Sequence, residues 1–177
     1  MPNKTHSLIL SGVFIALGLV LPMAFHMIGG AGPIFLPMHI PVLIAGFFLS
    51  PMLALSVGVI TPLLSGLLTG MPPIFPMMPI MMLELGIYGL TISLIRSNVT
   101  KNPYIALLVS MILGRIAGGF MVFVLSTFFA AKLPSALVFI TTAVTTGIPG
   151  IFIQLIIIPI VVIAINKSNL AIFEGAK

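Results

Sequence analysis

The chain has 177 residues, of which 60% are hydrophobic and only 5% are Asp, Glu, Lys or Arg. Charged residues make up roughly 25% of a soluble domain, so this composition excludes a water-soluble fold. No cysteine occurs, which excludes disulfides, thiolate catalysis and cysteine-ligated metals. The apolar runs are nearly continuous and do not alternate as barrel strands do, so we predict an all-α membrane protein with a single transmembrane domain over residues 1–177.

Six apolar segments follow one another along the chain and are predicted to cross the membrane. They are Ser7–Met27, Met38–Ser50, Met52–Thr69, Pro76–Ile95, Pro103–Phe129 and Leu137–Ile165. The second segment is short: at 1.5 Å per residue it covers only about 20 Å of a hydrocarbon core about 30 Å thick. Residues 38–69 could instead form one long broken helix or two short helices.

The positions of the basic residues decide between these arrangements. With six spans and a cytoplasmic N-terminus, all basic residues outside the spans except Lys132 lie on the cytoplasmic side, as the positive-inside rule prefers. Those residues are Lys4, Arg96, Lys101, Lys167 and Lys177. Merging the two short segments would move Arg96 and Lys101 outside. We therefore predict six spans with both termini in the cytoplasm.

Two outer connections are rich in glycine and proline and are predicted to shape a binding pocket. They cover residues 28–37 and 70–75, and they contain Phe35, Met71 and Phe75. Methionine adapts its shape and is frequent at binding surfaces, so Met71, Met77, Met78 and Met81 suggest a pocket lining. The alternative is that these methionines only face lipid.

Glu84 and Arg115 are the charged residues inside the predicted spans, where each costs about 2.5–3.5 kcal/mol at a helix centre. Counting from the ends of their helices places them at the same depth, so they can meet. They could form a buried ion pair between two helices, or also contact a polar ligand. Helical spacing places Met81 and Tyr88 beside Glu84, and Met111 beside Arg115.

His26 and His39 flank the first outer connection. Two histidines without a third ligand are too few for a metal site, so no metal is predicted. His39, beside Phe35 and Met38, is the better candidate for a ligand contact. An acid–base pair of His39 and Glu84 is not expected, because the predicted helices place Glu84 about 12 Å below His39. We predict no catalytic residue and no enzyme activity.

Small residues in two helices could allow close helix approach. Gly12 and Ala16 have this spacing in the first span, and Gly114 and Gly118 have it in the fifth. Each pair could serve internal packing or the docking of a partner subunit. In the last span, Thr145 is a candidate ligand contact among four threonines. No phosphate-binding loop occurs, so the chain has no evident means of hydrolysing ATP itself.

Several motifs together resemble a known family over about Ser7 to Lys167. They are Leu36-Pro37-Met38-His39-Ile40-Pro41-Val42-Leu43-Ile44-Ala45-Gly46-Phe47, Thr61-Pro62-Leu63-Leu64-Ser65, Gly70-Met71-Pro72-Pro73 and Glu84-Leu85-Gly86-Ile87-Tyr88-Gly89. The chain resembles the substrate-binding S components of energy-coupling factor (ECF) transporters. The resemblance implies a bundle of six helices in the plasma membrane of a prokaryote. It also implies an outward-facing pocket capped by the outer loops after helices one and three.

The resemblance further implies partners and a class of substrate. The partners are a transmembrane coupling subunit, which would dock on Gly12 and Ala16, and two ATPase subunits; no cofactor and no nucleic acid are expected. The substrate is expected to be a vitamin or vitamin precursor. A neutralised Glu84 and Arg115 would suit a neutral or zwitterionic ligand, a free Arg115 would suit pantothenate, and the Met, Phe and Tyr lining would suit pyridoxine-like rings or cobalamin precursors. The candidate substrate-binding residues are Phe35, Met38, His39, Met71, Phe75, Met81, Glu84, Tyr88, Met111, Arg115 and Thr145.

Overall fold

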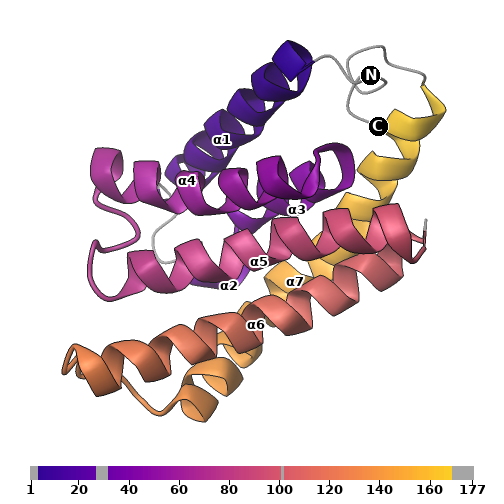
Figure 1. The fold of residues 1–177 in the computed structure, drawn as a ribbon. Coiled ribbons are helices and arrows are strands. Elements are labelled where there is room, and N and C mark those ends of the chain that lie inside the picture. Colours follow the sequence, from indigo (N-terminus) through magenta and orange to yellow (C-terminus); the bar gives the residue numbers. More distant parts are fainter. Residues whose placement is uncertain (1–3, 27–31, 101, 169–177) are drawn as a thin grey trace.

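The computed structural model describes residues 4–26, 32–100 and 102–168, and within these ranges all regular secondary structure is helical (Figure 1). The helices are α1 (Lys4–His26), α2 (Gly32–Phe35), α3 (His39–Phe48), α4 (Pro51–Thr69), α5 (Met77–Asn98), α6 (Pro103–Phe128) and α7 (Ala136–Lys167). The prediction of an all-α protein is confirmed. Lys101 and Lys177, which entered the topology prediction, lie outside the described residues.

Five of these helices are long and apolar enough to cross a membrane: α1, α4, α5, α6 and α7. The predicted span Met38–Ser50 corresponds to α3, a shorter apolar helix of ten residues that extends about 15 Å, and its crossing of the membrane stays a prediction. Ser50 precedes Pro51, which favours an extended backbone, and ψ of Ser50 is 157°. Helix α3 therefore ends before α4 begins, and it starts only at His39.

Helix ends elsewhere follow from local sequence. Asn102 caps α6 by accepting a hydrogen bond from the Tyr104 amide at 3.0 Å, and Pro103 occupies the first helical position. Gly70 ends α4 with a φ of 73°, a left-handed conformation that glycine adopts without steric cost.

Helix α5 lies between α4 and α6 and also packs on α3 (Figure 1). Small residues bring α4 and α5 together: Gly58 lies against the backbone of Leu85, and Gly89 lies against the backbone of Ala54. In α3, eight of the ten residues are buried. This short helix is therefore enclosed by the bundle, whereas the long helices expose apolar side chains.

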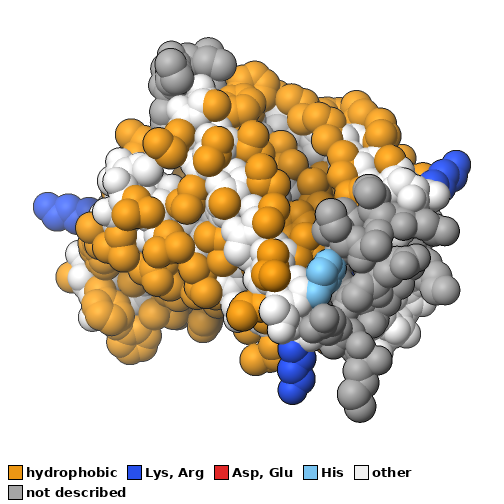
Figure 2. Space-filling view, turned by 90° about the horizontal axis from the view of Figure 1, so that it is seen from above, with side chains coloured by type: hydrophobic (Ala, Val, Ile, Leu, Met, Phe, Trp, Pro, Cys, Tyr) orange, Lys and Arg blue, Asp and Glu red, His pale blue; other side chains and the backbone are white. Residues whose placement is uncertain are grey.

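The exterior is mainly hydrophobic, and Lys and Arg side chains lie only at the margins of the face in Figure 2. In Figure 1, α5 and α7 end at the same side of the molecule where α1 and α6 begin. Lys4, Arg96 and Lys167 belong to this end, and Lys132 belongs to the α6–α7 connection at the other end. Lys4, Arg96 and Lys167 thus lie at one end of the bundle and Lys132 at the other, as the positive-inside argument predicted. Which end faces the cytoplasm stays a prediction.

Candidate functional site

A cavity of about 640 Å³ lies between α5, α6, α7, the segment that contains α2 and α3, and the α4–α5 connection. Its volume falls within the range of about 300–1,000 Å³ that is typical of small-molecule sites. The walls are mostly apolar, and five polar side chains line it among the described residues. These are His39, Glu84, Arg115, Thr142 and Thr146.

Glu84 of α5 is the centre of the polar cluster. Arg115 Nη1 on α6 lies 2.7 Å from Glu84 Oε1, which confirms the predicted encounter of the two charges. The Tyr88 hydroxyl, one turn further along α5, donates a hydrogen bond of 2.7 Å to the same oxygen. Glu84 is only 2% exposed, so the ion pair and the hydroxyl compensate a carboxylate that water cannot reach.

Two glycines of α6 make room for this cluster. A Cβ at Gly118 would lie 2.8 Å from Glu84 Oε2, and a Cβ at Gly114 would overlap the ring of Tyr88. The Gly114-x-x-x-Gly118 pattern therefore serves internal packing, which was one of its two predicted roles. The absence of side chains at these positions lets α5 and α6 approach closely enough for Arg115 to reach Glu84.

His39, the first residue of α3, also belongs to the cluster. Its Nε2 lies 3.5 Å from Glu84 Oε1, and its ring lies 5.6 Å from that of Tyr88 between centroids. The predicted separation of about 12 Å between His39 and Glu84 is wrong. The prediction placed His39 at the outer surface, whereas α3 is short and begins inside the bundle.

The imidazole of His39 has unmet hydrogen-bonding capacity. The 3.5 Å contact is longer than the 2.7–3.2 Å of an N–H···O hydrogen bond. Neither ring nitrogen has a hydrogen-bond partner in the part of the chain that the structure describes, and the residue is only 4% exposed. A buried polar atom without a partner costs about 1–3 kcal/mol. Such a residue in the wall of a cavity is a candidate for contact with a bound molecule.

Helix α7 holds the segment that leads into His39. Gln154 Nε2 donates a hydrogen bond of 3.4 Å to the Leu36 carbonyl. A Cβ at Gly150 would lie 2.7 Å from the carbonyl oxygens of Ile34 and Phe35, so only glycine lets α2 approach this closely. Leu36 has a φ of 51°, an uncommon left-handed conformation for a residue other than glycine. Together these contacts bring the chain inward and start α3 below the end of the bundle.

Six of the eleven predicted site residues line the cavity: Met38, His39, Met71, Met81, Glu84 and Arg115. The other five lie elsewhere. Phe35 packs on Phe25 with ring centroids 5.6 Å apart, Phe75 is 53% exposed, and Met111 packs against the main core. Tyr88 supports Glu84 without lining the cavity. The side chain of His26 lies outside the described residues.

Thr145, the fifth of these residues, donates its hydroxyl hydrogen bond to the Thr142 carbonyl at 3.1 Å and does not line the cavity. Thr142 and Thr146 line it instead, and the sequence prediction missed both. A signal for the correct face exists: Ala143, Gly147 and Gly150 form a stripe of small residues along α7, and Thr146 borders that stripe while Thr145 lies opposite.

The sequence prediction also missed most of the apolar lining. These residues are Pro22, Gly32, Pro33, Leu36, Pro37, Pro72, Pro73, Ile80, Pro134, Phe139 and Ala143. Most of them are prolines or glycines, and those of the connections have side-chain directions that follow no simple period. Met77, which the sequence suggested as a pocket-lining methionine, does line the cavity. Met77 and Ile80 lie on the same face of α5 as Met81 and Glu84.

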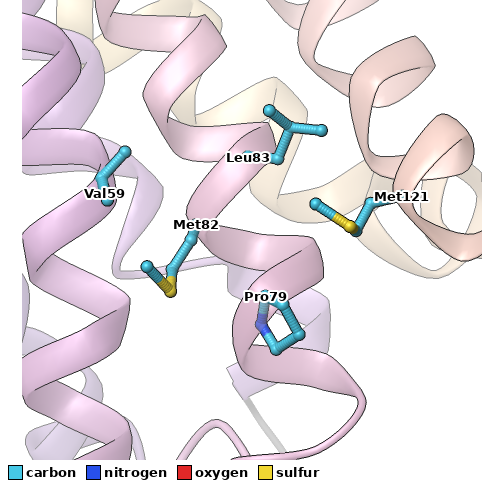
Figure 3. A pocket seen from close by; sticks show the side chains of 5 residues that line it. All are labelled: Val59, Pro79, Met82, Leu83 and Met121. Carbon is cyan, nitrogen blue, oxygen red and sulfur yellow. The ribbon is translucent and has the colours of Figure 1, made fainter. Parts of the chain in front are cut away.

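A second recess of about 240 Å³ lies on the other face of α5 (Figure 3). It is lined by Val59 of α4, Met121 of α6, and Pro79, Met82 and Leu83 of α5. None of these side chains is charged or carries a hydroxyl or amide, so the recess has no group for acid–base chemistry. In the described ranges, no three His, Cys, Asp or Glu residues come together in a group that could hold a metal ion.

The fold and the cavity together define a multi-helix membrane protein with an internal site whose polar groups are gathered around one buried ion pair. Comparison with protein families specifies it further. The sequence model of the family described as "ECF transporter, substrate-specific component" matches residues 6–162. The chain belongs to this family, whose members are transport proteins and not enzymes. No curated protein and no solved structure is similar enough to count as a match.

Proposed function

We propose that this chain captures a vitamin or vitamin precursor outside a prokaryotic cell and delivers it inward with an ECF module. The module would consist of a transmembrane coupling subunit and two ATPase subunits. The observation that carries the proposal is the 640 Å³ cavity, which has the Glu84–Arg115 pair and His39 in its wall. A ligand-free scaffold would have no need for a cavity lined by these costly buried polar groups.

An outward-facing cavity is part of the proposal. The cavity is lined by Met71 and Pro72 of the α4–α5 connection and by Pro134 of the α6–α7 connection. These connections lie at the end of the bundle opposite Lys4, Arg96 and Lys167 (Figure 1). The positive-inside rule assigns the basic end, and with it both termini, to the cytoplasm. The cavity would then receive substrate from outside.

Ligand binding is tested by thermal unfolding of the purified protein with a set of water-soluble vitamins and their precursors. The set includes pantothenate, pyridoxine and benzimidazole precursors of cobalamin. A true ligand at 100 times its Kd is expected to add about 2.7 kcal/mol to the free energy of unfolding and so to raise Tm. If no member raises Tm and no small molecule copurifies with the protein, the proposed function is contradicted.

The exposed face of α1 is the proposed docking site for the coupling subunit. Gly12 and Ala16 are both exposed, and a Cβ added at Gly12 would meet nothing within 4 Å. This notch of small residues leaves room for a partner helix to approach closely. Neither residue takes part in the internal cavity, so docking and ligand binding should be separable.

The docking proposal predicts that Gly12→Leu combined with Ala16→Leu abolishes copurification of the coupling subunit, because two large side chains would fill the notch. Vitamin-induced stabilisation should stay unchanged. Leu17→Ala, at an exposed position on another face of α1, serves as a control for altering an exposed position. Normal assembly of the double variant would remove this face from the interface.

A further inference from the structure

We propose that the substrate is a ring compound without net charge that presents one polar edge to His39. This inference deepens the proposed function and rests on it. Three features of the cavity carry it: the closed ion pair, the imidazole of His39, whose nitrogens have no hydrogen-bond partner among the described residues, and the apolar, methionine-rich walls.

The ion pair argues against a substrate with a net charge. Arg115 and Glu84 neutralise each other at 2.7 Å, and Glu84 Oε1 also accepts the Tyr88 hydrogen bond. An anion bound here would meet the Glu84 carboxylate, and a cation would meet the Arg115 guanidinium, in a site of low exposure where repulsion is strong. The other polar side chains in the lining of the described site are Thr142 and Thr146, which carry no charge, and His39, which carries none as a neutral imidazole. A ligand without net charge meets neither repulsion.

His39 is the group that the ligand's polar edge would satisfy. Both of its ring nitrogens lack a hydrogen-bond partner within the described ranges, although the residue lies in the cavity wall. A neutral imidazole has one donor and one acceptor nitrogen. A heterocycle or a ring hydroxyl offers matching groups at one edge. Arg115 retains further N–H donors beside it, because among the described residues its side chain pairs only with Glu84.

The remaining walls favour a ring over an extended hydroxylated chain. Met38, Met71, Met77 and Met81 line the cavity, and thioethers pack favourably on aromatic rings. A ligand with polar groups along its whole length would leave most of them facing apolar side chains without hydrogen bonds, which is unfavourable. The substrate's polar groups should therefore gather on one side, towards His39 and Arg115.

The test begins with the chemical identity of the ligand. The full chain is purified from the membranes of its host in mild detergent, and the bound compound is released by denaturation and identified by mass spectrometry. If the protein is empty, the compound is the water-soluble vitamin that raises its Tm. We expect a ring compound with no net charge at pH 7. A charged or acyclic compound would overturn this inference and leave the proposed function intact, whereas no ligand at all would overturn the proposed function.

Variants of His39 then test its role with the identified compound. His39→Phe keeps a ring against Tyr88 but removes both nitrogens, and we expect it to weaken binding about tenfold, the equivalent of one hydrogen bond. His39→Asn, which retains a donor and an acceptor, should recover much of the affinity. Thr145→Val is the control and should bind normally, because Thr145 does not line the cavity.

The stability of the empty variants separates recognition from a structural role. His39→Phe should unfold at the Tm of the wild type or above it, since it removes two buried ring nitrogens that have no hydrogen-bond partner among the described residues. Unchanged affinity in His39→Phe would contradict the inference. So would a loss of affinity that is matched by a lower Tm of the empty protein and is not rescued by His39→Asn.

Discussion

At the scale of single residues, the organisation of the site depends on one carboxylate. Glu84 contacts side chains from three helices: Tyr88 on its own helix α5, Arg115 on α6 and His39 on α3. A charge at this depth is costly, and the Arg115 contact offsets that cost only while both partners are present. Removing one partner should therefore be worse than removing both.

This leads to a prediction for the pair. Glu84→Gln alone is expected to destabilise the protein by about 3–5 kcal/mol, because it leaves the Arg115 charge without compensation. Adding Arg115→Met should recover a large part of that loss, measured as Tm or by chemical unfolding in detergent. Additive losses would show that the two charges do not stabilise each other.

The same double variant separates a binding protein from a scaffold. If the cluster contacts substrate, the folded double variant should no longer be stabilised by the identified vitamin. A double variant that is folded and still stabilised by the vitamin would place the ligand contacts elsewhere in the cavity.

At the scale of helices, glycines decide how close α5 and α6 can come. Gly114 and Gly118 face Tyr88 and Glu84 directly, whereas Gly12 on α1 faces open space. The same residue type therefore has opposite consequences in two helices. A methyl group added at Gly114 or Gly118 would clash with α5, whereas one added at Gly12 would only raise the helix propensity.

The matched pair Gly114→Ala and Gly12→Ala tests this reading. We expect Gly114→Ala to lower stability by about 1–3 kcal/mol, because its Cβ would overlap the Tyr88 ring. Gly12→Ala is expected to leave the isolated protein as stable as the wild type or up to about 1 kcal/mol more stable. Thermal unfolding of both variants under identical conditions provides the measurement. Equal effects would mean that α5 and α6 are less tightly packed than in the structure.

At the scale of the whole molecule, the distribution of polar and apolar residues is the reverse of that in a soluble protein. The face in Figure 2 is mainly apolar, whereas Glu84 and His39 of the polar cluster are buried. The segment that contains α2 and α3 does not stay at the surface: it extends into the bundle, and α3 is almost completely buried. The polar cluster and the cavity thus both belong to the interior of the bundle, and the cavity is lined by residues of the long helices α1, α5, α6 and α7 and of the connections.

The absence of cysteine makes the orientation directly testable. We expect Lys132→Cys in the α6–α7 connection to react with a membrane-impermeant maleimide in intact cells, and Asn98→Cys at the end of α5 to react only after permeabilisation. Both positions are exposed, so access from one side or the other should decide the labelling. The reverse pattern would invert the topology and place the cavity on the cytoplasmic side.

Much of this organisation is readable from the sequence alone. The long, continuous apolar runs determine a helical membrane protein, because a bilayer admits only helices and closed barrels, and barrel strands alternate between polar and apolar residues. The sequence also predicts that Glu84 and Arg115 pair with each other, because each is an isolated charge at a similar depth and needs an opposite charge nearby. The motifs from Leu36 to Gly89 further indicated the family that the comparison confirms.

Tertiary structure alone decided the depth of α3 and the face of α7 that lines the cavity. A count of residues from the membrane surface assumes that each helix starts there, but Gln154 and Gly150 hold the preceding segment inside the bundle, and His39 therefore reaches Glu84. Likewise, the sequence does not show which of the four threonines in α7 face the cavity, because this depends on how α7 packs against the other helices. Such features depend on contacts between segments distant in the chain, such as the bond from Gln154 to Leu36, and local periodicity does not contain that information.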